Sequence, residues 1–91
     1  MVLTEISGDG IRLKCKKPIT LNYIIKDNKL FFDDDKLDIY LCSNSEKELY
    51  DEFCEFIICD YISFIKDKET PMTKSAKEYS KLLQDMFIEI T

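Results

Sequence analysis

Apolar and polar residues alternate over the first part of the chain, and this alternation predicts strands. Residues 11–16 (IRLKCK) place apolar side chains on one face and basic side chains on the other, which is typical of a half-buried strand. Residues 19–25 (ITLNYII) are rich in β-branched and aromatic side chains, which favours a second strand. Pro18 ends or interrupts the first strand because proline cannot donate to a ladder. Residues 2–6 are either a further short strand or a frayed segment that precedes the first strand.

Two turn signals divide the residues that follow. Asp27 and Asn28 tolerate the left-handed region of backbone space and predict a tight hairpin turn before a return strand. The acidic run at residues 33–36 is interpreted as a second, solvated turn, and residues 37–42 (LDIYLC) alternate again. Consecutive short strands joined by tight turns predict an antiparallel β-meander of three or four strands within residues 1–42.

The period then becomes helical, and a helix is predicted over residues 45–66. Ser45 and Glu48 have the spacing of a capping box, in which the hydroxyl accepts a backbone N–H and the carboxylate reaches back. The apolar arc on the helical wheel is wide, which indicates contacts on more than one side. This arc contains Leu49, Tyr50, Phe53, Cys54, Ile57, Ile58, Tyr61, Ile62, Phe64 and Ile65.

A second helix is predicted over residues 73–89, where the apolar residues form one amphipathic stripe. Either Thr70 followed by Pro71, or Thr73, would cap it. The stripe must be buried, and the second side of the first helix is the expected place. The pattern therefore predicts one α+β domain over residues 1–91, with a small antiparallel β-meander followed by two α-helices packed on one face.

The distribution of charge narrows the range of partners. The chain of 91 residues has a net charge of −5. Residues 1–45 contain seven Lys or Arg and seven Asp or Glu, whereas residues 46–91 contain six and eleven, so the excess lies in the second half. An acidic chain lacks the electrostatic footprint of a phosphate-binding protein, so nucleic acid and anionic membranes are not expected partners. A basic protein partner is compatible with this charge.

The cysteines do not form a metal-binding pattern. Cys15, Cys42, Cys54 and Cys59 are expected to be free thiols in a reducing compartment. Cys54 and Cys59 would diverge by roughly 140° on a helix, and the chain contains no histidine. Serine and threonine occur at predicted caps and turns, so no nucleophile–base set is visible. We therefore expect no cofactor, no metal and no enzymatic activity.

Neither a membrane span nor a targeting signal is apparent. The longest apolar run is far below the about 18–20 residues that a spanning helix needs. The first ten residues lack a basic region followed by an apolar one, so a cytoplasmic location is expected.

Two passages resemble known small prokaryotic proteins. The passage LDIYLCSNSEKELYDEF is similar to the strand-to-helix junction of HicB-like antitoxins. The passage MTKSAKEYSKLLQDMF resembles the ending of short uncharacterised bacterial and archaeal proteins in which that junction recurs. Together they cover about half of the chain. The sequence has no C-terminal helix-turn-helix or ribbon-helix-helix, so the resemblance implies an antitoxin-like interaction with a protein and no DNA binding.

The polar side of the first predicted helix is the candidate interaction surface. Its carboxylates form either a solvated face or a docking face for a basic partner. Cys59 interrupts the acidic stripe, and two isoleucines extend the apolar arc beyond what one small domain can cover. The candidate surface is formed by Glu48, Asp51, Glu52, Glu55, Ile58, Cys59 and Ile62.

Two classes of function follow from these patterns. The first is a non-enzymatic protein–protein interaction module, of an antitoxin-like kind, that neutralises a basic partner. The alternative is a homo-oligomeric structural or scaffold protein, such as a homodimer, in which the wide apolar arc of the helix meets its own copy. A group of strand cations would either pair with the acidic stripe of a second copy or protect a sheet edge from aggregation. These cations are Arg12, Lys14, Lys16 and Lys17.

Overall fold

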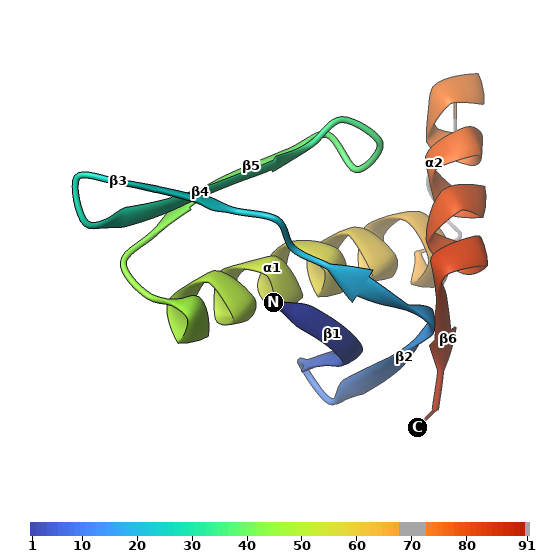
Figure 1. Cartoon of the computed structure of the whole chain (residues 1–91). Helices are drawn as coiled ribbons and strands as arrows, with labels where there is room; N and C mark the ends of the chain where they lie inside the picture. Colours follow the sequence, from blue (N-terminus) through green and yellow to red (C-terminus); the bar gives the residue numbers. More distant parts are fainter. Residues whose placement is uncertain (68–72, 91) are drawn as a thin grey trace.

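Two three-stranded antiparallel sheets pack on a central helix in the computed structural model, which describes residues 1–67 and 73–90 (Figure 1). The first sheet has the strand order β1-β2-β6, and the second has the order β3-β4-β5. Helix α1 contacts β1 of the first sheet and β5 of the second. The prediction of an α+β fold is confirmed, although the strands form two sheets instead of one meander. The strands are β1 (Val2–Gly8), β2 (Ile11–Thr20), β3 (Ile24–Lys26), β4 (Lys29–Asp34), β5 (Ile39–Ser43) and β6 (Phe87–Glu89).

Strand β2 continues through Pro18 because its pairing with β1 is interrupted there. Leu3 lies opposite Ile19, whereas Glu5 lies opposite Lys14, so the intervening residues of β2 bulge away from the ladder. A proline within this bulge removes no ladder hydrogen bond to β1. The pairing with β1 is interrupted near Pro18 as predicted, but β2 runs on to Thr20. The predicted second strand over residues 19–25 is therefore wrong, because residues 21–23 lie in no strand and β3 begins at Ile24.

The hairpin of the second sheet follows the predicted turn chemistry. Asp27 and Asn28 have φ angles of 52° and 62°, and Lys26 lies opposite Lys29. Two residues with positive φ between paired strands match the right-handed twist of a hairpin. The next turn starts later than predicted, because β4 extends to Asp34, whose Oδ1 accepts the backbone N–H of Leu37 at 3.1 Å.

Helix α1 (Glu46–Tyr61) begins at the predicted cap and supplies the centre of the core. Ser45 Oγ accepts the backbone N–H of Glu48 at 3.1 Å. Phe53 is fully buried, and its ring meets Phe32 of β4 edge-to-face at 6.0 Å between centroids. The helix continues to residue 66 as predicted, but its last five residues form a π-helical turn, η1 (Ile62–Lys66).

Helix α2 (Lys74–Met86) packs on this π-helical turn and on the first sheet. Thr73 is the cap, because its Oγ1 accepts the backbone N–H of Ala76 at 3.1 Å. The alternative cap at Thr70 and Pro71 lies outside the described residues. Tyr79 meets Phe64 of η1 edge-to-face, with ring centroids 5.0 Å apart. Helix α2 therefore packs on η1, the extension of α1, whereas the sequence predicted that it would pack along the flank of α1.

The end of the second predicted helix is corrected by the structure. Phe87 is extended, with φ −131° and ψ 153°, and residues 87–89 form β6 instead of a last helical turn. Cys15 lies opposite Phe87 and Lys14 opposite Ile88, so β6 pairs with the edge of β2 that β1 leaves free. The same residues fit a period of two as well as a helical stripe. Long-range pairing with β2, which satisfies backbone donors and acceptors, decides between them.

Within the described ranges, no helix combines the length and the apolar character that crossing a membrane requires.

Candidate functional site

The exposed ridge of α1 consists of residues four apart on the helix. Asp51, Glu55 and Cys59 are exposed, and they occupy successive turns of the same side. The ridge lies between two flanks of the helix, because one flank packs on β1 and the other on β5. These three members of the predicted surface therefore remain available to a partner.

Two further carboxylates of the predicted surface are partly used by the fold. Glu52 is half-buried, and its Oε2 accepts a hydrogen bond from Ser43 Oγ at 2.7 Å. Ser43 is 1% exposed, so this bond ties α1 to the end of β5. Glu48 is half-buried in the first turn, where the positive end of the helix dipole favours a carboxylate.

The prediction that Ile58 belongs to an exposed surface is wrong. Ile58 is 1% exposed and packs against β1 beside Gly8. A Cβ atom added at Gly8 would lie 3.4 Å from Ile58 Cγ1. Ile62 is half-buried against the core in η1. The wide apolar arc is wide because α1 contacts two sheets, so these isoleucines do not require a second molecule to cover them.

A groove follows the flank of α1 beside β5. It has a volume of about 310 Å³, and Leu41 of the edge strand β5 faces Phe56 of the helix across it. Three carboxylates surround these apolar side chains, and the described part of the lining contains no basic side chain. The complete described lining is Leu41, Glu52, Glu55, Phe56, Cys59 and Asp60. Such a groove can accept an extended segment that carries an apolar and a basic side chain two residues apart on the same face.

Asp60 lines this groove and is tied to α2 by a hydrogen bond. Tyr79 donates its hydroxyl proton to Asp60 Oδ2 at 2.5 Å. Burial, and then this hydrogen bond, raise the pKa of Tyr79, so the phenol remains a donor at neutral pH. Leu41, Phe56 and Asp60 were not predicted as members of the surface. Phe56 lies one turn after Glu52 and Asp60 one turn after Phe56 on the helix, but the position of Leu41 depends on the packing of β5.

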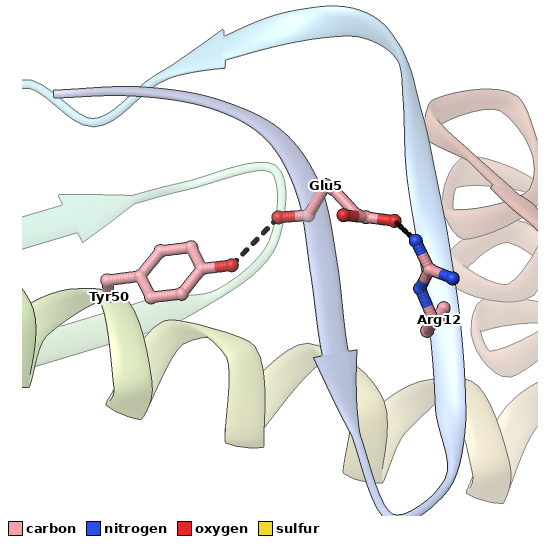
Figure 2. Close-up of polar contacts among 3 residues, drawn as sticks. All are labelled: Glu5, Arg12 and Tyr50. Carbon is pink, nitrogen blue, oxygen red and sulfur yellow. Dashed lines mark hydrogen bonds and ion pairs between the residues drawn. The ribbon is translucent and has the colours of Figure 1, made fainter.

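The opposite flank of α1 is fastened to the first sheet by a tyrosine. Tyr50 donates to the backbone oxygen of Glu5 at 3.0 Å, and Arg12 Nη2 donates to the Glu5 carboxylate at 2.6 Å (Figure 2). Burial is the main reason why the pKa of Tyr50 rises to about 12. Burial also raises the pKa of the neighbouring Cys54 thiol, which keeps it neutral and inert. This flank therefore has a structural role.

The basic side chains of β2 point away from the ridge. Leu13 and Cys15 are buried towards the core, so Arg12, Lys14 and Lys16 project from the opposite face of the first sheet. They cannot neutralise the groove within the same molecule.

All four cysteines are free thiols in the structure, with Cys15 and Cys54 buried and Cys42 and Cys59 exposed. The described residues contain no group of three or more His, Cys, Asp or Glu side chains that could hold a metal ion.

No protein-family model, no curated protein and no solved structure matches this chain.

Proposed function

We propose that this protein is a small, non-enzymatic protein–protein interaction module that acts in the cytoplasm and binds a basic protein partner along α1. The proposal rests on the groove between β5 and α1. Leu41 and Phe56 offer apolar contact, while Glu52, Glu55 and Asp60 surround it with negative charge. A cationic side chain placed there would meet several carboxylates at once, and opposite potentials on two surfaces favour encounter and register.

The free edge of β5 adds a backbone component to this site. β5 is the last strand in the order β3-β4-β5, so one of its edges is unpaired within the sheet. An extended partner segment can add to such an edge, with backbone hydrogen bonds supplying affinity and alternate side chains supplying specificity. A segment that places an apolar side chain on Phe56 and a Lys or Arg beside Glu55 fits this arrangement.

The second class, self-assembly through the helix arc, is not supported at that position. Ile58 is buried and Ile62 is half-buried within a single chain. A scaffold role would need a different surface from the one that the sequence suggested.

Affinity capture from the native host with matched charge variants tests the proposed groove. We expect the wild-type chain to retain a basic protein, and Glu55→Lys to lose it, because one groove carboxylate becomes a cation. Glu78→Lys on α2 makes the same change of charge on an exposed side chain outside the groove and should retain the partner. Capture that is equal for both variants, or no basic protein retained by the wild type, would contradict the proposal.

The antitoxin-like form of the proposal has its own test. If the partner is a toxin encoded beside this chain, expressing that neighbouring reading frame alone should arrest growth. Co-expression of the wild-type chain or of Glu78→Lys should restore growth, and Glu55→Lys should restore it poorly. Unchanged growth when the neighbour is expressed alone would exclude this form while leaving the groove to be judged by capture.

A further inference from the structure

The outer face of the second sheet is apolar in the middle and oppositely charged at its two ends. Strand register places Ile24, Phe31 and Cys42 side by side on this face, because residues directly opposite in a ladder project to the same side. Towards the hairpin tip the next pair is Lys26 and Lys29. In the other direction, the next row along the same face contains Asp33 and Tyr40.

No part of the described chain, residues 1–67 and 73–90, covers this face. Ile24 is 67% exposed and Tyr40 is 68% exposed, although each lies beside other apolar side chains. A hollow of about 360 Å³ opens between them, and Phe31 and Asp33 also line it. Helix α1 packs on the opposite face of this sheet at β5 and at Phe32 of β4, which meets Phe53, while Ile25 of β3 is 69% exposed on that face. Contiguous exposed apolar surface of this kind marks an interaction site.

The charge pattern along this face is complementary to the same face of a second copy that is turned end to end. Along β4, the outward side chains are Lys29, Phe31 and Asp33, which are basic, aromatic and acidic in turn. If two such faces meet with their strands antiparallel, the cation of each copy lies over the carboxylate of the other. The apolar middle rows then lie over each other. The same face reversed end to end is therefore its own charge complement.

We propose that two copies of this chain associate through the outer faces of their second sheets, with the strands of the two copies antiparallel and Lys29 of each copy facing Asp33 of the other. The two sheets pack as a sandwich about 10 Å apart. A two-fold axis parallel to the sheets and perpendicular to the strands places Phe31 over Phe31 and Cys42 over Cys42 of the second copy. This dimer goes beyond the proposed function and does not rest on it, because the groove at Leu41 lies on the opposite side of β5.

Sedimentation of charge-swapped variants tests the dimer. The wild-type chain should change from monomer to dimer as its concentration rises. Lys29→Glu and Asp33→Lys should each weaken the dimer by roughly tenfold or more, because two attractive pairs become two repulsive ones. The double variant, which exchanges the charges and keeps the net charge, should regain most of the wild-type dimer constant. Lys77→Glu and Glu78→Lys, exposed side chains of α2, make equal changes of charge elsewhere and should leave the dimer unchanged.

Circular dichroism and thermal unfolding of each variant show whether it is folded, so loss of the dimer is separated from loss of structure. A wild-type chain that sediments as a monomer at millimolar concentration overturns the proposal. So does a double variant that associates no better than the single ones, or single variants that associate as well as the wild type.

Cross-linking provides an independent readout of the geometry. Cys42 lies on the proposed face and Cys59 lies on α1, and both are exposed. A short bismaleimide is a suitable reagent, because sheets about 10 Å apart hold facing thiols beyond disulfide distance. Cys59→Ser should form cross-linked dimers and Cys42→Ser should not. The reverse result, or equal cross-linking of both variants, contradicts the proposed face.

Discussion

The two sheets of this protein have equal numbers of antiparallel strands but are assembled from the chain in opposite ways. The second sheet uses three consecutive strands, joined by tight turns, whereas the first joins β1 and β2 to β6 from the far end of the described chain. Their outer faces differ as well. The first presents Arg12, Lys14 and Lys16, whereas the second presents an apolar middle row between opposite charges. The first sheet is thus held together by pairing between distant segments. The second is built from neighbouring strands, and the described residues leave its apolar face uncovered.

The largest expected effect concerns the strand that closes the first sheet. Phe87 is 2% exposed, so Phe87→Ala should lower the free energy of unfolding by about 3–5 kcal/mol. Ile88→Ala in the same strand is the control, because Ile88 is 50% exposed and should cost within about 0.5 kcal/mol. Urea unfolding measures both. Equal costs would mean that β6 does not close the core and that the two sheets differ less than described.

The tie between the second sheet and α1 should have a smaller effect. Ser43→Ala removes the donor to Glu52 and should cost about 1.5 kcal/mol, as expected for a hydrogen bond to a charged acceptor. Ser7→Ala, an exposed serine of the first sheet, serves as the control in the same unfolding experiment. If the two substitutions lower the free energy of unfolding equally, the buried hydrogen bond of Ser43 does not contribute to stability.

Helix caps are expected to come next. Ser45→Ala should destabilise the protein by about 1 kcal/mol, because the backbone N–H of Glu48 loses its acceptor. Ser75→Ala, beyond the cap of α2 and exposed, should be nearly neutral. A neutral Ser45→Ala would show that contact with both sheets fixes the start of α1 without help from its cap.

The smallest effect is electrostatic and belongs to the first sheet. Lys66 Nζ donates to the Glu89 carboxylate at 2.9 Å, which lowers the pKa of Glu89 and raises the pKa of Lys66. A carboxylate with a lowered pKa stabilises the fold above its ordinary value of 4.5, and this contribution is lost as pH falls through the folded value. The ammonium contributes below its ordinary value of 10.5 and loses its contribution above it.

Glu89→Gln should therefore lower the melting temperature slightly at neutral pH, and the difference from the wild type should shrink in acid below pH 4.5. Melting curves from acid to neutral pH measure this difference. A difference that is independent of pH would mean that the ion pair does not contribute.

How far the sequence predicted this structure follows the same division between local and long-range interactions. The Asp27–Asn28 turn and the Ser45 cap depend on neighbours within a few residues, and they were predicted correctly. The centre of α1 at Leu49, Phe53 and Ile57 was also predicted, because local helical spacing marks the apolar face even though distant strands bury it. Strand β6 was missed because the same residues also fit a helical stripe. Only the distant edge of β2 decides between the two.

The candidate site divides in the same way. The acidic ridge at Asp51 and Glu55 follows from helical spacing and was predicted, whereas Ile58 was placed on the surface because its contact with Gly8 joins distant segments. The groove at Leu41 and Phe56 depends on how β5 lies against α1. The pattern of charges along β4 was visible in the sequence, but register with β3 and β5 was needed to show that it forms one face.

A dilution series of two-dimensional ¹H–¹⁵N NMR spectra tests most directly whether the uncovered face of the second sheet is where two copies meet. As concentration rises, the resonances that shift should belong to the outer face of β3, β4 and β5, around Ile24, Phe31, Asp33, Tyr40 and Cys42. Resonances of the α1 ridge and of β2 should stay unchanged. Spectra that are independent of concentration would contradict a dimer, and shifts confined to the α1 ridge and the cations of β2 would place self-association on those two surfaces instead.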